Sequence, residues 1–259
     1  MLLLNSMNKK ISETSWGGVA KWYDEVVEEK GSYQKDVILP NILRLVDVKK
    51  GDKILDLACG QGFFASEFEK LGADVVASDI SSELINIAKE KNKNIKFVVS
   101  PADDISFLGD NTVDKITIIL ALQNIDNLNG VFKECRRILK TNGKLFVVLN
   151  HPAFRIPKVS SWGFDDEMGV QYRRLDSYLS ESRIKIDMTP GSKENKKFTI
   201  SFHRSLQTYF KAFKNNGFCV ENFEEWISDR KSEPGKRQKA EDRARKEFPM
   251  FAMIEASKM

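Results

Sequence analysis

Residues 54–64 read Ile-Leu-Asp-Leu-Ala-Cys-Gly-Gln-Gly-Phe-Phe, and this stretch decides the fold. The apolar run 54–57 predicts a buried strand, and the small residues after it, with Gly60 and Gly62, predict a tight turn that a ligand can approach closely. A helical pattern starts at Phe63. Strand, glycine turn and helix together predict a binding pocket at the carboxyl end of the strand, because the N–H groups of the helix start face it.

Two kinds of cofactor are compatible with this loop. Gly60, Gly62 and Ala65 fit the spacing of a dinucleotide-binding loop, in which Asp79 would accept hydrogen bonds from ribose hydroxyls. Asp56 favours a different cofactor. A carboxylate at the strand end repels a pyrophosphate, whereas it attracts the cationic ammonium and sulfonium groups of S-adenosylmethionine.

The stretch Asp56–Gly62 resembles the first motif of the class I S-adenosylmethionine-dependent methyltransferases. The resemblance continues at Asp79 and at Ala102-Asp103, and it covers most of the chain from about Ser15 onward. It implies an enzyme that uses S-adenosylmethionine and releases S-adenosylhomocysteine. The residues that it assigns to the cofactor are Asp56, Ala58, Gly60, Gln61, Gly62, Asp79, Ile80, Ala102, Asp103, Leu120 and Gln123.

The resemblance also implies a role for several of these residues. Asp79 binds the ribose and Asp103 the adenine amino group, while Leu120 and Gln123 line the side of the sulfonium. An ordinary helix cap or turn is the alternative for the two aspartates. Both follow predicted strands at their carboxyl ends, where parallel sheets bind ligands, so the ligand role is favoured.

The alternation of strands and helices predicts an α/β fold with a doubly wound, mostly parallel seven-stranded sheet and a lid-like insertion after the fifth strand. Four parts are expected: N-terminal helices over the cofactor (1–48), a Rossmann-like cofactor-binding core (49–150), an insertion acting as substrate lid (151–204) and the completion of the sheet (205–259).

Several elements are predicted individually. In the insertion, residues 183–188 and 197–203 alternate polar with apolar side chains and are expected to pair as a hairpin. A helix from Leu128 is expected to stop at Asn142-Gly143, and a charged helix is expected at 233–246.

The composition indicates a globular protein with one sizeable core. The 259 residues are 41% hydrophobic and 30% charged, with a net charge of +4. Acidic and basic residues are interspersed, which argues against a nucleic-acid partner. Leu2–Leu4 is too short for a signal peptide, and no run approaches the ~20 apolar residues of a membrane span, so no membrane partner is expected.

The three cysteines lie far apart in the sequence. Cys59 falls in the tight turn, Cys135 on a helix face and Cys219 in a strand pattern. An odd and scattered set predicts neither a disulfide framework nor a metal site. We therefore expect no metal, and a reducing compartment such as the cytoplasm.

Both histidines of the chain, His151 and His203, flank the insertion. Each is a candidate catalytic residue that takes a proton from a hydroxyl or amine acceptor. A histidine that only bonds the backbone of a turn is an equally weighted alternative.

Arginines and aromatic residues are the other candidates for the substrate side. Arg155, Arg173, Arg174 and Arg204 suit an anionic acceptor, although surface ion pairs with nearby acidic residues are at least as common an outcome. The aromatic candidates are Trp16, Tyr23, Tyr33 and Tyr172.

Two absent motifs narrow the acceptor. Residues 122–125 lack the Asn/Asp-Pro-Pro-aromatic tetrapeptide of exocyclic-amine methylases of nucleic acids, and no Pro-Cys nucleophile is present. The segment His151–Pro157 is similar to the insertions of generic small-molecule methyltransferases. We expect in-line methyl transfer to O, N or C of a small molecule by a monomer or homodimer. A tRNA- or RNA-modifying enzyme, a non-catalytic S-adenosylmethionine-binding protein and an NAD-type dehydrogenase stay open as alternatives.

Overall fold

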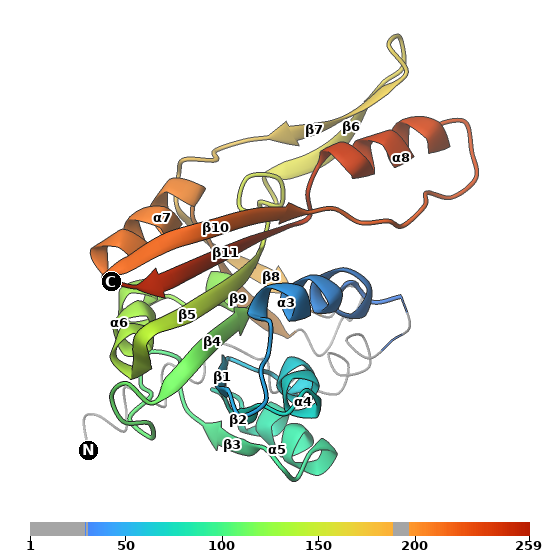
Figure 1. Cartoon of the computed structure of the whole chain (residues 1–259). Helices are drawn as coiled ribbons and strands as arrows, with labels where there is room; N and C mark the ends of the chain where they lie inside the picture. The colour runs from blue at the N-terminus through green and yellow to red at the C-terminus, as the bar shows by residue number, and fades with distance from the viewer. Residues whose placement is uncertain (1–28, 30, 189–196) are drawn as a thin grey trace.

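The computed structural model describes residues 29, 31–188 and 197–259. Its centre is a seven-stranded sheet in the order β10-β11-β5-β4-β1-β2-β3 (Figure 1). Neighbouring strands are parallel except at β11, which runs antiparallel to both β5 and β10. The predicted fold class is therefore confirmed.

The strands of the central sheet are β1 (Lys53–Leu57), β2 (Asp74–Asp79), β3 (Lys96–Val99), β4 (Val113–Ile119), β5 (Leu139–Asn150), β10 (Phe218–Trp226) and β11 (Phe251–Lys258). The helical elements are η2 (Gln34–Ile38), α3 (Leu39–Val46), α4 (Phe63–Lys70), α5 (Ser82–Lys91), η3 (Leu122–Asn124), α6 (Leu128–Ile138), α7 (Leu206–Asn215) and α8 (Gln238–Glu247). Within the described ranges, none of these helices is long and apolar enough to cross a membrane.

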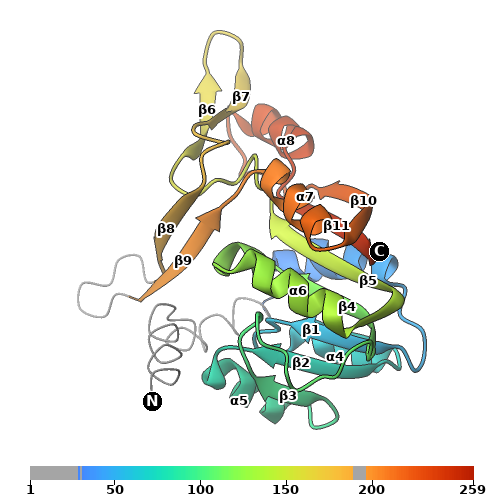
Figure 2. The same cartoon turned by 90° about the vertical axis from the view of Figure 1, so that its left-hand side faces the viewer.

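Helices cover both faces of the sheet. On one face lie α6 and α7 (Figure 2). They bury aromatic side chains such as Phe132 and Phe213. On the other face, α3, α4 and α5 bury Ile42, Phe68 and Ile85. The residues of β1 after Lys53, most of β4 and residues 145–149 of β5 are buried, as near-continuous apolar runs predict for a sheet covered on both sides.

The segment between β5 and α7 forms two hairpins that stand off the central sheet (Figure 2). The strands β8 (Ser182–Asp187) and β9 (Phe198–His203) pair antiparallel, which confirms the predicted hairpin. The strands β6 (Ser160–Asp165) and β7 (Val170–Leu175) form the second hairpin. This second hairpin was not predicted.

Two predicted boundaries are wrong. The helix α6 ends at Ile138 rather than at Asn142-Gly143, because Leu139 already pairs with Val113 of β4. The charged helix α8 starts at Gln238 rather than at residue 233. Trp16 and Tyr23, two of the aromatic candidates, lie outside the described residues, as does most of the N-terminal segment 1–48.

Candidate functional site

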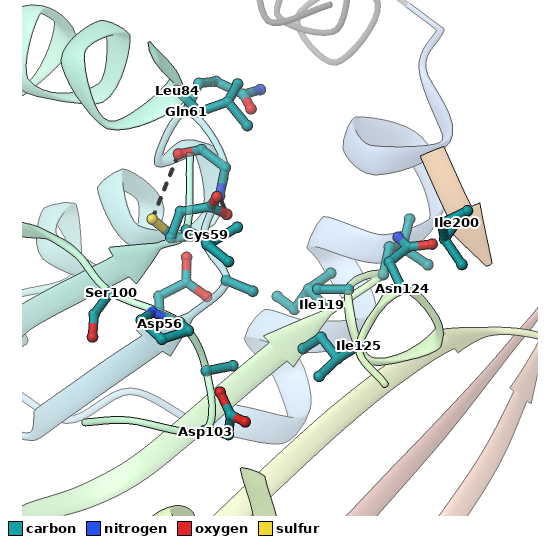
Figure 3. A pocket seen from close by; sticks show the side chains of 18 of the residues that line it. Asp56, Cys59, Gln61, Leu84, Ser100, Asp103, Ile119, Asn124, Ile125 and Ile200 are labelled. Atoms are coloured by element: carbon teal, nitrogen blue, oxygen red, sulfur yellow. Dashed lines mark hydrogen bonds between the residues drawn. The ribbon is translucent and has the colours of Figure 1, made fainter. Parts of the chain in front are cut away.

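A cavity of about 210 Å³ lies at the carboxyl ends of β1 to β4 (Figure 3). We call it the first cavity. Asp56 and Cys59 come from the end of β1 and the loop after it, and Ile119 and Ile125 form an apolar wall on the β4 side. Of the predicted cofactor residues, those that line it are Asp56, Ala58, Gly60, Gln61, Asp79, Ile80, Ala102, Asp103 and Leu120.

The loop after β1 is held by the carboxylate of Asp79. Its Oδ2 accepts a hydrogen bond from the backbone N–H of Gly60, and its Oδ1 accepts one from Ser81, each at 2.9 Å. Gly60 has φ of 58°, a conformation that glycine adopts without strain. A carboxylate oxygen can accept more than one hydrogen bond, so Asp79 keeps capacity for ribose hydroxyls. Burial raises the pKa of this carboxyl group.

Asp56 carries the one orphaned carboxylate oxygen among the buried groups of the described residues. Its Oδ1 accepts a 2.8 Å hydrogen bond from the hydroxyl of Thr117 in β4, whereas Oδ2 has no partner. Burial raises the pKa of Asp56 to about 7, against the lowering effects of the Thr117 hydroxyl and of the backbone N–H of Ala65 in the first turn of α4. A buried carboxylate of this kind needs a cation or donor to complete it, which fits a cationic cofactor and opposes a pyrophosphate.

Two predicted cofactor residues lie elsewhere. Gly62 does not line the first cavity; a Cβ there would sit 2.8 Å from the ring of Phe97 and 3.3 Å from the Cβ of Ala88. Its small size lets α4 pack closely on α5 and β3. Gln123 lines the neighbouring cavity, and its Nε2 donates to the carbonyl of Leu120 at 2.7 Å.

A second cavity, of about 530 Å³, adjoins the first. The residues that line both are Gln34, Leu120 and Asn124. Its remaining walls come from the insertion, the end of β5, Phe251 of β11, Tyr33 and Gln123. Leu120 and Asn124 therefore lie at the junction of the two cavities, where a ligand bound in the first cavity would contact a ligand bound in the second.

The substrate candidates divide into those that reach the second cavity and those that do not. Tyr33 and Arg155 line it, together with Arg173. Tyr172 is 48% exposed on β7 and lines neither cavity. Arg204 lines neither cavity; it is buried, and its Nη2 donates to the carbonyl of Asp126 at 2.8 Å.

Neither histidine lines the first or the second cavity. His151 is buried; its Nδ1 accepts from the N–H groups of Ala153 and Phe154, so its Nε2 carries the proton and donates to Glu225 at 2.6 Å. Burial lowers the pKa of His151. His203 is buried as well, with Nε2 at 2.8 Å from the carbonyl of Tyr178. This geometry favours the structural alternative for both.

Some residues of the site are absent from the sequence-based predictions. Thr117 lines neither cavity but supports Asp56 from below; it is a polar residue inside the apolar run of β4, and this could have been used to predict it. Asn124 and Gln34 carry no such signal, since their place at the junction depends on how the chain folds. Across the described part of the chain, no three His, Cys, Asp or Glu side chains lie close enough to hold a metal ion.

The sequence of the chain is similar to those of known methyltransferases. Residues 55–147 match a family model described as a methyltransferase domain. A demethylmenaquinone methyltransferase of Paenarthrobacter aurescens is 31% identical over 57% of this chain and 59% of its own length. A ubiquinone/menaquinone biosynthesis C-methyltransferase of Rickettsia prowazekii is 38% identical over 37% of this chain and 43% of its own length. The chain thus spans about half the length of these curated relatives.

A solved structure shares the fold over most of the chain. The S-adenosylmethionine-dependent methyltransferase of Mesorhizobium loti superposes with a TM-score of 0.68 at 24% sequence identity. The match covers 85% of this chain and 96% of that protein. At this identity the likeness concerns the fold, and it extends well beyond the matched domain.

Proposed function

We propose, from the premise that the chain belongs to the class I S-adenosylmethionine-dependent methyltransferases, that it transfers a methyl group from this cofactor to a small molecule. The observation that carries the proposal is the unpartnered Oδ2 of Asp56 in the first cavity. An ionised carboxylate there attracts the positive charge of the methionine end. The larger second cavity beside it supplies room for an acceptor.

The residues of the first cavity would share the cofactor as follows. Asp56 and the loop at Gly60 hold the methionine end, Asp79 accepts from the ribose hydroxyls and Asp103 lies near the adenine. Leu120 stands at the junction, on the sulfonium side. Gly62 does not contact the cofactor in this assignment; it lets α4 pack closely on α5 and β3.

The cofactor, when bound, supplies an electrophilic methyl group on its sulfonium. The chain has to hold an acceptor atom in line with that methyl group and exclude water, and orientation of this kind contributes much of the rate. Among the described residues that line the second cavity there is no His, Asp or Glu. Leu120, Asn124 and the apolar insertion residues act by positioning the acceptor.

A small-molecule acceptor is favoured over RNA by two observations. The curated relatives bear names from quinone biosynthesis. The second cavity, of about 530 Å³, is lined partly by the insertion and has the size of a small-molecule site. Its presence also favours an enzyme over a non-catalytic binding protein. We further propose a monomer or homodimer in the cytoplasm, where the free thiols of Cys59, Cys135 and Cys219 stay reduced.

Ligand-dependent thermal unfolding tests the proposal. S-adenosylhomocysteine at a hundred times its Kd is expected to stabilise the protein by about 2.7 kcal/mol, while NAD leaves the melting temperature unchanged. Transfer of label from a methyl-tritiated donor to a metabolite pool then tests catalysis. Stabilisation by NAD with no response to S-adenosylhomocysteine would contradict the assignment.

A further inference from the structure

The two adjoining cavities carry opposite charge. The acidic residues that line the first cavity are Asp56, Asp79, Asp103 and Asp126, and Arg183 is the cation among its described lining residues. The second cavity is lined by Arg155, Lys158 and Arg173, and no carboxylate is among its described lining residues. The acidic lining of the first cavity suits a cationic methyl donor. The basic lining of the second cavity favours a negatively charged ligand.

Arg155 is held in place with most of its donors unused. Its Nη1 donates to the side-chain oxygen of Asn150 at 2.7 Å, and its guanidinium lies 5.4 Å from the ring centroid of Phe251. No ion pair joins it to a described carboxylate. A guanidinium carries five N–H donors, so four remain for a ligand. Burial and the neighbouring charge of Arg173 lower its pKa, yet an arginine stays protonated.

Arg173 reaches the same cavity from β7. Its Nε donates to the carbonyl of Phe154 at 2.8 Å, and its Nη2 donates to the hydroxyl of Ser160 at 2.7 Å. The guanidinium lies 5.0 Å from the ring centroid of Trp162. Like Arg155, it has neutral partners only among the described residues. Two guanidinium groups fixed by neutral partners, without a counter-ion, form an arrangement that an anion completes.

We propose that the methyl acceptor is an organic oxyanion, a molecule with an apolar body and a carboxylate or phosphate group that Arg155 and Arg173 bind. This inference rests on the proposed function and specifies its substrate class. The apolar body would lie against Ile156, Ile186 and Met188, which line the same cavity. The atom that receives the methyl group would lie near Leu120 and Asn124 at the junction.

The transfer balances without a further reactant. A lone pair of the acceptor atom forms the bond to the methyl carbon, and the electron pair of the broken S–CH3 bond stays on sulfur as a neutral thioether. An acceptor O–H, N–H or C–H loses its proton to water. The anionic group held by the two arginines takes no part in bond formation, and it orients the acceptor.

Calorimetric titration of the protein saturated with S-adenosylhomocysteine tests the inference. The probes are benzoate, phenyl phosphate and the neutral benzamide. At least one anion is expected to bind, and benzamide to bind at least tenfold more weakly; the preferred anion tells carboxylate from phosphate acceptors. Arg155→Gln and Arg173→Gln should each weaken anion binding by at least tenfold, and Arg155→Lys should recover part of the loss because the charge returns.

Arg174→Gln is the matched control. Arg174 is the neighbour of Arg173 on β7, is exposed and pairs with Asp176, so its loss should leave anion binding unchanged. Affinity for S-adenosylhomocysteine, measured on each variant, shows that the fold and the cofactor site are intact. The inference would be overturned if benzamide bound as tightly as the anions, if neither anion bound, or if both arginine variants kept full affinity for the anions. If the unmodified protein did not bind S-adenosylhomocysteine, that result would instead contradict the proposed function.

Discussion

The hydroxyl of Thr117 donates a 2.8 Å hydrogen bond to one carboxylate oxygen of Asp56 and leaves the other oxygen buried without a partner. This pair joins β4 to β1 beneath the first cavity. The hydrogen bond fixes the orientation of the carboxylate, and the free oxygen keeps the site available to a cation. Cofactor binding and protein stability are thus coupled at a single side chain.

Asp56→Asn is expected to stabilise the ligand-free protein while weakening S-adenosylhomocysteine binding by at least tenfold. The pKa of Asp56 rises from 3.8 to about 7 on folding, so between these values the folded state binds more protons, and stability falls as pH rises. Above pH 7, the ionised Asp56 lowers the free energy of unfolding by roughly 4 kcal/mol, at about 1.4 kcal/mol per pKa unit. Thermal unfolding at pH 8 should therefore favour the variant, and the advantage should shrink toward pH 4. An unchanged melting temperature at pH 8 would contradict this.

Cofactor affinity should rise with pH through about 7. Only the ionised Asp56 attracts the ammonium group, and its pKa in the ligand-free protein is about 7. Titration calorimetry with S-adenosylhomocysteine measures this affinity as a function of pH. A range of roughly pH 5.5 to 8.5 brackets the pKa of Asp56. In Thr117→Val the midpoint should move to higher pH, because the hydrogen bond that lowers the pKa is gone. A flat profile in the unmodified protein would remove Asp56 from the ammonium site.

Gly62→Ala should destabilise the protein by about 1–3 kcal/mol, the usual cost of overpacking. The added methyl group meets the Phe97 ring at 2.8 Å, and the φ of 77° is unfavourable for alanine. Gly169→Ala is the control, because Gly169 has a φ of 62° but open space around it. The difference between the two unfolding free energies isolates the packing contribution. Equal losses would show that backbone conformation alone requires glycine at position 62.

His151→Ala should lower the free energy of unfolding by about 2 kcal/mol, because the N–H groups of Ala153 and Phe154 lose their acceptor. Urea unfolding measures this loss. Glu225→Gln should cost far less, since the Glu225 side chain is 46% exposed. Methyl transfer per folded molecule should be retained in both. A specific loss of turnover in His151→Ala, with unfolding unchanged, would restore the histidine as a catalytic candidate.

His151 also predicts a pH dependence of stability. Burial lowers its pKa in the folded state below 6.5, so the unfolded chain binds more protons as pH falls through 6.5. The neutral, hydrogen-bonded ring of His151 therefore stabilises the fold above pH 6.5, and this stabilisation is lost as pH falls below 6.5. Thermal unfolding of the unmodified protein and of His151→Ala across pH 5 to 8, roughly the range in which histidine titrates, measures the difference. A constant difference between the two curves would contradict this titration.

The sequence by itself determined the core of this protein, because the information is local. Apolar runs, the glycine turn and the residues at strand ends specify β1, β2 and β4 and the cavity above them, since parallel strands necessarily bring their carboxyl ends to one edge. The hairpin of β8 and β9 followed from its alternation of polar and apolar residues. Asp56 stands out in the sequence itself, because a charged residue in an apolar strand has few uses other than binding a ligand.

Only the tertiary structure decided the functions of the remaining residues. Arg155 and Arg173 lie in different parts of the insertion, and they line one cavity only because Arg173 of β7 donates to the carbonyl of Phe154 and to the hydroxyl of Ser160. His151 resembled a catalytic residue in sequence, whereas its neighbours in space occupy both ring nitrogens. Gly62 fitted a ligand-binding pattern and instead makes room for Phe97. Such roles arise from contacts between residues distant in sequence, and no local pattern encodes which of those contacts form.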